Sequence, residues 1–412
     1  MSQRPRVVVT GIGAVTPVGT GVDDFWKGMT SGRNGVRRIT QFPTEDLPVK
    51  VAGEVDGFDP AAYLETKEAR RSDRYVQFAL ASASLAWADA AAPEIVSERG
   101  GCIYGTGIGG IQTLLTQHSV LLDRGPGRVS PFMVPMLMAN AAAGHIAMRY
   151  GLTGHNMATL SACASSNNAI GEGMRLIRDG YLDLCVVGGS EAATVPLTVA
   201  AFAQMTALTK NPDPETASRP FDAARNGFVL SEGAATLILE SEVHAKTRGA
   251  RVYCEVAGYG ASDDAYHITA PDPKGGGATL AMRWALRDAG ARPEDVSYIN
   301  AHGTSTPLND AAETVAIKAA LGEDVANRVA VSSTKSMTGH MLGAAGAVEG
   351  AVCALAITNG MIPPTIHYTT PDPDCDLDVV PNEARTMDVR LALSNSFGFG
   401  GQNACIAFRA IG

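Results

Sequence analysis

The chain has 412 residues, of which 45% are hydrophobic and 18% are charged. This length and composition predict a well-packed globular protein of one large or two ordinary domains, and they exclude a disordered chain. The formal net charge of −9 argues against nucleic acid as a partner, because binding to a phosphate backbone requires a basic surface.

The cysteines favour a reduced compartment. All seven are scattered along the chain without a C-x-x-C pair, which disfavours a disulfide scaffold or a zinc site. Five of them lie inside apolar runs and are expected in the core: Cys102, Cys185, Cys254, Cys353 and Cys405.

The sequence shows no apolar region typical of a signal peptide near Met1. Its longest apolar helical stretch, residues 342–358, is interrupted by Glu349 and is short for a membrane span. We therefore expect a cytoplasmic protein with no membrane partner.

Residues 1–250 predict buried strands that alternate with helices. Residues 6–11 form a β-branched run ended by glycine, which is typical of a strand covered on both faces. Residues 75–90 carry apolar side chains at helical spacing. Further strands are expected at 101–107, 182–189 and 234–240, and a strand followed by a helix is expected within 157–171.

Residues 251–412 repeat this order of elements. Helices are expected at 278–289, 310–321 and 342–358, with strands at 251–258, 296–302, 329–333, 391–396 and 403–408. Each half then has the order β, α, β, α, β, α, β, β, which predicts a duplicated α/β fold built from parallel β-α-β units. We expect the helix after Cys163 to pack against the glycine- and alanine-rich helix of residues 342–358.

Cys163 lies at the turn where a buried strand gives way to a helix. The first N–H groups of a helix lack partners and carry partial positive charge. This position is expected to lower the pKa of the thiol, and the same N–H groups could hold an oxyanion. The alternative is an ordinary buried cysteine of the core.

Two histidines also follow predicted strands, at His302 and His340, and a glycine-rich loop at 398–401 follows a third strand. Ligands bind at the carboxyl ends of strands in open α/β sheets, so these features and Cys163 are expected at one edge. A single histidine after a strand is more often structural, but four such features together favour an active site.

Six motifs extend over essentially the whole chain, at residues 8–13, 162–163, 218–222, 300–306, 333–340 and 395–401. Together they resemble the β-ketoacyl-[acyl carrier protein] synthases of the long-chain elongating class, which are condensing enzymes of the thiolase fold. The resemblance implies a duplicated five-layer α-β-α-β-α architecture and a homodimer. The implied reaction is a decarboxylative Claisen condensation of an acyl group with malonyl-acyl carrier protein in fatty acid elongation.

The resemblance also implies roles for the residues of the site. Cys163 would take the acyl group as a thioester, while His302 and His340 would donate hydrogen bonds that stabilise the enolate formed from malonyl. The N–H groups of Cys163 and Phe399 would form the oxyanion hole. No metal or cofactor is implied, because the lost carboxylate supplies the carbanion and the phosphopantetheine arm belongs to the acyl carrier protein.

Other residues have supporting roles by the same resemblance. Lys335 and Glu349 would lie beside the two histidines, and a buried structural ion pair is the other interpretation of these charges. Thr304 and Thr306 would hydrogen-bond the phosphopantetheine arm, with turn capping as the alternative.

The substrate-binding residues implied for the acyl chain are Ile108 and Met133, with Met133 reaching across the dimer; both could equally be ordinary core residues. Gly400, in the glycine-rich loop, is also assigned to substrate binding. Gln402 stands where many relatives carry Thr, which leaves the hydrogen bonding of this loop open.

Related enzymes of the fold fit less well. A biosynthetic thiolase needs a second catalytic cysteine near the C-terminus, but Cys405 lies in a predicted strand. The three-carbon-primer starter class pairs its cysteine with His and Asn, whereas both motifs here carry His. A non-catalytic chain-length subunit typically lacks the cysteine. A catalytic ketosynthase subunit of a type II polyketide system remains the alternative.

Overall fold

The computed structural model describes residues 5–412. Its N-terminal half contains β1 (Val7–Thr16), β2 (Gly19–Thr20), α1 (Val22–Thr30), β3 (Val36–Arg38), β4 (Val51–Gly53), α2 (Thr66–Ala69), α3 (Arg74–Asp89), β5 (Gly100–Gly105), α4 (Ile111–Arg124), α5 (Met133–Leu137), α6 (Ala141–Tyr150), β6 (Asn156–Thr159), α7 (Ser165–Arg178), β7 (Leu184–Glu191), α8 (Pro196–Gln204), β8 (Gly233–Ser241) and α9 (Glu242–Thr247). The C-terminal half contains β9 (Cys254–Asp263), α10 (Gly276–Asp288), β10 (Tyr298–Asn300), α11 (Pro307–Leu321), α12 (Glu323–Ala326), β11 (Ala330–Ser332), α13 (Lys335–Thr338), α14 (Ala345–Asn359), β12 (Met361–Ile362), β13 (Arg385–Thr386), β14 (Leu391–Phe397) and β15 (Gln402–Arg409).

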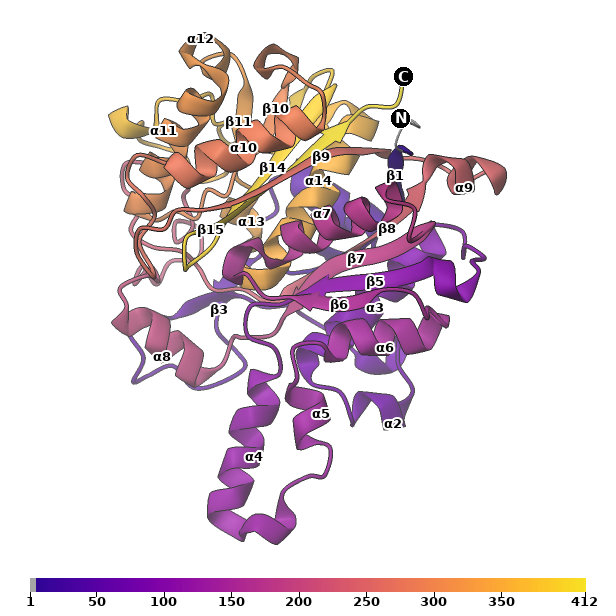
Figure 1. Ribbon diagram of the computed structural model, residues 1–412. Helices are drawn as coiled ribbons and strands as arrows, with labels where there is room; N and C mark the ends of the chain where they lie inside the picture. Colours follow the sequence, from indigo (N-terminus) through magenta and orange to yellow (C-terminus); the bar gives the residue numbers. More distant parts are fainter. Residues whose placement is uncertain (1–4) are drawn as a thin grey trace.

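A large mixed sheet runs through the molecule in the order β11-β10-β14-β15-β9-β1-β8-β7-β5-β6 (Figure 1). Its two halves repeat one topology, since β6-β5-β7-β8-β1 has the same order as β11-β10-β14-β15-β9. They join where β1 pairs with β9. The predicted duplication is therefore confirmed.

The expectation of parallel β-α-β units holds for only part of each half. The strands β6, β5 and β7 are parallel, as are β11, β10 and β14. The remaining neighbours in each half pair antiparallel. The short loop between β14 and β15 accounts for that pair, because a connection of a few residues can join only antiparallel neighbours.

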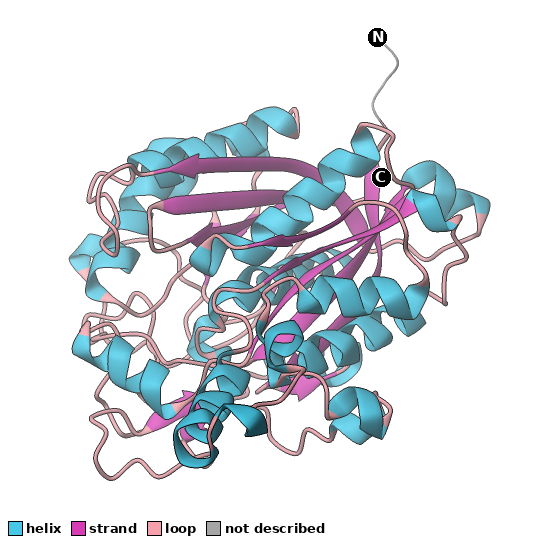
Figure 2. Ribbon diagram, turned by 60° about the horizontal axis from the view of Figure 1, so that its bottom comes forward, coloured by secondary structure: helices cyan, strands magenta, loops and turns pink. Residues whose placement is uncertain are grey.

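The helices form three layers around the two halves of the sheet (Figure 2). One outer layer contains α3 and α6 on the N-terminal half, and the other contains α10 and α11 on the C-terminal half. Between them, α7 and α14 contact strands of both halves. This arrangement is the expected five-layer α-β-α-β-α architecture.

The strands are apolar on both faces because helices cover both faces. In β5, Ile103 faces the middle layer, whereas Cys102 and Tyr104 pack with the outer helices. In β14, Ala392 faces the middle layer and Leu393 the outer one. Successive strand residues point to opposite faces, so a sheet covered on both faces requires a continuous apolar run.

The apolar helix of the C-terminal half is a core helix. The stretch Leu342–Asn359 is long and apolar enough to cross a membrane, but 83% of it is buried inside the fold. Small residues allow α14 to approach α7 closely, since a Cβ on Gly346 would lie 2.8 Å from Asn167 Oδ1. The expected packing of these two helices is confirmed.

The segment from α4 to α5 is absent from the predicted elements. It extends away from the body of the molecule, as the lower part of Figure 1 shows. Several of its large apolar side chains are exposed in the single chain: Leu114, Leu121, Leu122, Phe132 and Val134. These apolar side chains do not pack into the core of the single chain, so reasoning from the core did not predict the segment.

Candidate active site

Cys163 lies where the sequence placed it, at the entry to α7. Strand β6 ends at Thr159, a short 3-10 turn spans Ala162–Ala164, and the helix begins at Ser165. Ala162 has a φ of 49°, in the left-handed region that side chains adopt with strain. The sharp turn directs the Cys163 side chain into the cavity described below.

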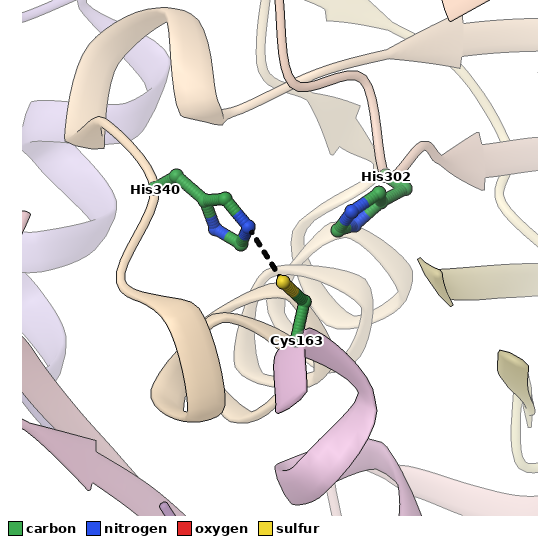
Figure 3. A group of neighbouring side chains, drawn as sticks. All are labelled: Cys163, His302 and His340. Atoms are coloured by element: carbon green, nitrogen blue, oxygen red, sulfur yellow. Dashed lines mark hydrogen bonds between the residues drawn. The ribbon is translucent and has the colours of Figure 1, made fainter. Parts of the chain in front are cut away.

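The structure brings Cys163, His302 and His340 together from distant parts of the chain (Figure 3). The Sγ of Cys163 and one ring nitrogen of each histidine lie within 4.8 Å of one another. Nε2 of His340 lies 3.0 Å from Sγ, at hydrogen-bond distance. All three side chains are buried, so reactions among them proceed away from bulk water.

The expected lowering of the Cys163 pKa is wrong for this structure. Burial raises the pKa of the thiol to about 12, although Lys335 and a backbone hydrogen bond from Phe399 act in the opposite direction. Desolvation of the charged form outweighs the helix terminus because the sulfur is enclosed. The thiol is therefore neutral at rest, and its proton must leave as it attacks; Nε2 of His340 is placed to accept it.

The two imidazoles are neutral. Burial lowers the pKa of His302 and of His340 well below the usual value, and the positive charge of Lys335 lowers both further. A neutral imidazole can donate from one nitrogen and accept at the other. A neutral imidazole can therefore supply the hydrogen bond that the family resemblance implies for each histidine.

Lys335 and Glu349 form a buried ion pair, as the structural interpretation predicts. Nζ of Lys335 also donates to the backbone oxygen of His302, at 2.7 Å. Burial raises the pKa of Glu349 to about 7, while Lys335 acts to lower it. The pair thus holds His302 in place and sets the local charge without lining the cavity.

One buried carboxylate of the site, Glu313, escaped the sequence analysis. It lies on α11 and accepts hydrogen bonds from the backbone N–H groups of His302 (2.8 Å) and Gly303 (2.7 Å). Asn395 also donates to it, at 3.2 Å. Its signal was an acidic residue on the buried face of a helix directly after the His302 motif.

The glycine-rich loop lies against the Cys163 turn. A Cβ on Gly398 would be 2.8 Å from the oxygen of Ser161 and 3.1 Å from the backbone nitrogen of Cys163, so only glycine permits this approach. Phe399 lines the cavity beside Cys163. The Gln402 side chain is exposed, and its backbone oxygen accepts from Gly398 at 2.7 Å. The backbone N–H of Phe399 hydrogen-bonds the Cys163 sulfur, while an oxyanion hole formed by the N–H groups of Cys163 and Phe399 stays a prediction.

A cavity of about 490 Å³ leads to the three side chains. It extends from buried Cys163 to Leu308, which is 66% exposed, so it reaches the surface. Most of its lining is apolar, including Ile108 and the aromatic side chains Phe202 and Phe228. Its shape and lining suit an apolar chain that is delivered from outside.

Thr304 and Thr306 lie where they could contact a phosphopantetheine arm, and Thr306 also caps a helix. Thr304 and Thr306 line the cavity, and their hydroxyls lie 2.9 Å apart. Thr306 also caps α11 by accepting from the N–H of Asn309. The capping interpretation is therefore confirmed for Thr306, while contact with a phosphopantetheine arm stays a prediction.

Two of the predicted substrate-binding residues lie outside the cavity of the single chain. Met133 begins α5 and Gly400 is in the glycine-rich loop, but neither lines it. The N–H of Gly400 instead donates to the oxygen of Ile268, at 2.7 Å. Their contacts with substrate stay predictions.

The cluster of Cys163, His302 and His340 consists of side chains that can bind soft metal ions. The charge of Lys335, which lowers the pKa of both histidines, opposes a second cation there. The expectation that the site works without metal stays a prediction.

Comparison with known proteins places the whole chain in one family. The N-terminal domain model of β-ketoacyl synthase matches residues 4–245, and the C-terminal domain model matches residues 253–369. A 3-oxoacyl-[acyl-carrier-protein] synthase 2 from Synechocystis is 51% identical over 99% of this chain and 98% of the relative. The protein of that name from Staphylococcus aureus strain COL is 48% identical over 99% of each chain.

Solved structures show the same fold. A β-ketoacyl synthase from Burkholderia phymatum matches with a TM-score of 0.91 at 35% identity, over 99% of this chain and all of that one. The ishigamide ketosynthase/chain length factor matches with a TM-score of 0.94 at 37% identity, over the full length of both. The chain belongs to the β-ketoacyl synthase family and is a condensing acyltransferase of fatty acid elongation.

Proposed function

We propose that Cys163 carries the acyl group and that the two histidines serve the decarboxylation. In the first step the sulfur attacks the thioester carbonyl of an acyl carrier, and His340 takes the thiol proton and returns it to the departing carrier thiol. The N–H groups of Cys163 and Phe399 stabilise the oxyanion. The observation that carries this proposal is the 3.0 Å contact between Nε2 and Sγ.

In the second step malonyl carrier loses carbon dioxide. The electron pair of the broken bond forms an enolate, whose oxygen accepts hydrogen bonds from His302 and His340; His340 donates from Nε2 after its ring proton has exchanged from Nδ1 to that nitrogen. The enolate carbon then attacks the acyl carbonyl on Cys163 and expels the sulfur, which takes up one proton to restore the thiol. Donors fixed in advance stabilise such developing charge without reorganisation.

We propose that acyl carrier protein delivers both substrates. A cavity that reaches the buried Cys163 from the surface suits a group carried on a long arm. A solved type II polyketide ketosynthase in complex with its acyl-carrier protein is 36% identical to this chain, with a TM-score of 0.91 over the full length of both. The chain itself needs no resident cofactor for this chemistry.

We propose a homodimer formed through the exposed segment from α4 to α5 and the edge strand β6. The apolar side chains Leu122 and Val134 of this segment are each more than half exposed in the single chain, and β6 lies at an end of the sheet. Met133, on the same segment, would then reach the partner's cavity. The test is the mass in solution, which should be twice that of one chain.

The free state of all seven cysteines supports a reducing cytoplasm.

The experiment that tests the function is a chain-length profile with the purified protein alone. We expect elongation of saturated acyl carriers with malonyl carrier, and one carbon dioxide released per product. A requirement for a second, different protein subunit would instead favour the polyketide alternative. The identity of 48–51% to proteins named 3-oxoacyl-[acyl-carrier-protein] synthase 2, against 36% to the type II polyketide ketosynthase, supports the first outcome.

Replacing Ile108 with phenylalanine tests the acyl cavity. Ile108 lines the cavity, so Ile108→Phe adds bulk where the growing chain must lie. We expect kcat/KM to fall by about tenfold or more for long primers and by less than about twofold for short ones. The measurement is elongation across a series of acyl carriers.

The matched control adds the same ring elsewhere. Val243, on α9, is 70% exposed and does not line the cavity, so Val243→Phe should leave the profile unchanged. A loss for Ile108→Phe that is equal at every chain length would indicate a packing defect and contradict the proposed acyl site.

A further inference from the structure

A buried carboxylate beside the cavity has no part in the steps above. Glu191 ends β7, and its side chain is completely buried. Among residues 5–412 it makes no ion pair; its oxygens accept only backbone N–H groups and one hydroxyl. Burial raises its pKa to about 7, against the effect of these hydrogen bonds. A carboxylate held in this way fixes the groups that surround it.

The first group is the turn that follows β5. Oε2 of Glu191 accepts from the N–H of Gly107 at 2.7 Å, and Oε1 accepts from Ile108 N–H at 3.3 Å and from the Thr106 hydroxyl at 3.1 Å. Thr106 Oγ1 in turn accepts from the N–H of Gly109 at 3.1 Å. The backbone that carries the Ile108 side chain into the cavity is therefore built on this carboxylate.

The second group is the turn that follows His340. Oε2 of Glu191 also accepts from the N–H of Gly343, at 3.1 Å. The two turns touch, since a Cβ on Gly343 would lie only 2.1 Å from the nitrogen of Gly107. Leu342, next to Gly343, belongs to the C-terminal half and lines the same cavity. One carboxylate thus joins walls of the cavity that come from the two halves of the chain.

The duplicated fold gives an internal comparison. Strands β5 and β10 have the same place in their halves, and each ends in a turn held by a buried glutamate. Glu313 holds the turn after β10, which presents His302 to the substrate. Glu191 holds the turn after β5, which presents Ile108 to the cavity.

We propose that Glu191 is a positioning residue for long acyl chains. It fixes the turn that carries Ile108 against the turn that follows His340. The position of Ile108 then sets kcat/KM for acyl groups that are long enough to pass it. The inference rests on the proposed function, because it requires that the cavity hold the acyl chain. Short primers end nearer Cys163 and are insensitive to this contact.

The test is Glu191→Gln, measured as kcat/KM for a myristoyl carrier and for a butyryl carrier. Each oxygen of Glu191 accepts hydrogen bonds from two donors. In the glutamine variant the NH₂ group replaces one of these oxygens and cannot accept, so two hydrogen bonds are lost in either orientation of the amide and one turn is loosened. We expect the myristoyl-to-butyryl ratio to fall about fivefold or more. A purely structural loss of active protein would lower both values equally and leave the ratio unchanged.

The matched control is Glu54→Gln. Glu54 is also buried and does not line the cavity; among residues 5–412 it accepts only from the backbone N–H groups of Thr40 and Gln41 and from the Thr40 hydroxyl. This variant should keep the wild-type ratio. Glu191→Asp gives a second variant, whose shorter carboxylate cannot hold both turns and should change the ratio in the same direction.

The role of Ile108 is tested in a double mutant. In an Ile108→Ala background, Glu191→Gln should change the ratio by less than twofold, because the side chain that Glu191 positions is gone. An unchanged ratio for both Glu191 variants, or a full effect that persists without Ile108, would overturn the inference. If the wild type and Glu54→Gln elongate neither primer, the proposed function itself is wrong.

Discussion

Replacement of Cys163 with alanine is expected to abolish condensation, by a factor of about 10⁴ or more. Cys163 is the cysteine that lines the cavity, and its sulfur lies 3.0 Å from Nε2 of His340. Alanine removes the atom that would bond to the acyl group and leaves the fold almost unchanged, because the side chain projects into a cavity. The measurements are product formation and the transfer of a labelled acyl group to the protein.

Another buried cysteine provides the control for this experiment. Cys185 lies in β7, is completely buried and does not line the cavity. Cys185→Ala should retain acyl labelling and condensation, with at most a modest loss of thermal stability. Acyl labelling of Cys163→Ala at the normal rate would place the thioester on another residue and contradict the assignment.

The fold was predictable from the sequence to a large extent because the core repeats. Buried strands covered on both faces give continuous apolar runs, as residues 6–11 and 391–396 show; β1 begins at Val7 within the first run, and β14 contains the second. The segment from α4 to α5 was not predictable by the same reasoning. Its apolar side chains are exposed in the single chain, so their spacing is not set by packing against the core of this chain.

The site shows the same division. The positions of Cys163, His302 and His340 followed from the carboxyl ends of the parallel strands β6, β10 and β11, although β6 and β11 stand at opposite ends of the sheet order and the sequence did not show how the two halves bring them together. The pKa of Cys163 did not, because it depends on how completely the sulfur is enclosed. Glu313 lies only 11 residues after His302, so an acidic residue on the buried face of the next helix was a usable signal, whereas Glu191 accepts from backbone N–H groups 84 and 152 residues away, which no local pattern encodes.

The raised pKa of Cys163 gives the two histidines different roles in acylation, because the neutral thiol must pass its proton to a nearby base. The sequence alone predicts that the helix terminus activates the thiol, so that loss of either imidazole would impair acylation less than decarboxylation. In the structure the thiol is neutral, and Nε2 of His340 lies at hydrogen-bond distance from it. His302 makes no such contact with the sulfur in the described chain. We therefore expect His340, but not His302, to contribute to acylation.

Both His302→Ala and His340→Ala should lose decarboxylation of malonyl carrier by about 10² or more, because each removes one donor to the enolate oxygen. Acylation of Cys163 should stay near the wild-type rate in His302→Ala. In His340→Ala it should fall by about tenfold, less than decarboxylation falls, because Lys335 and the Phe399 N–H still favour the thiolate. The measurements are carbon dioxide release and transfer of a labelled acyl group, each assayed alone.

The control for the histidines is His155→Ala, which removes an exposed imidazole and should leave both half-reactions unchanged. Equal losses of acylation and decarboxylation in both histidine variants would contradict the division of roles. That result would mean that each imidazole mainly maintains the shape of the site. The rings of His302 and His340 lie with centroids 5.3 Å apart, which places both near one enolate oxygen. Normal decarboxylation in His302→Ala would therefore contradict the proposal that His302 stabilises the enolate.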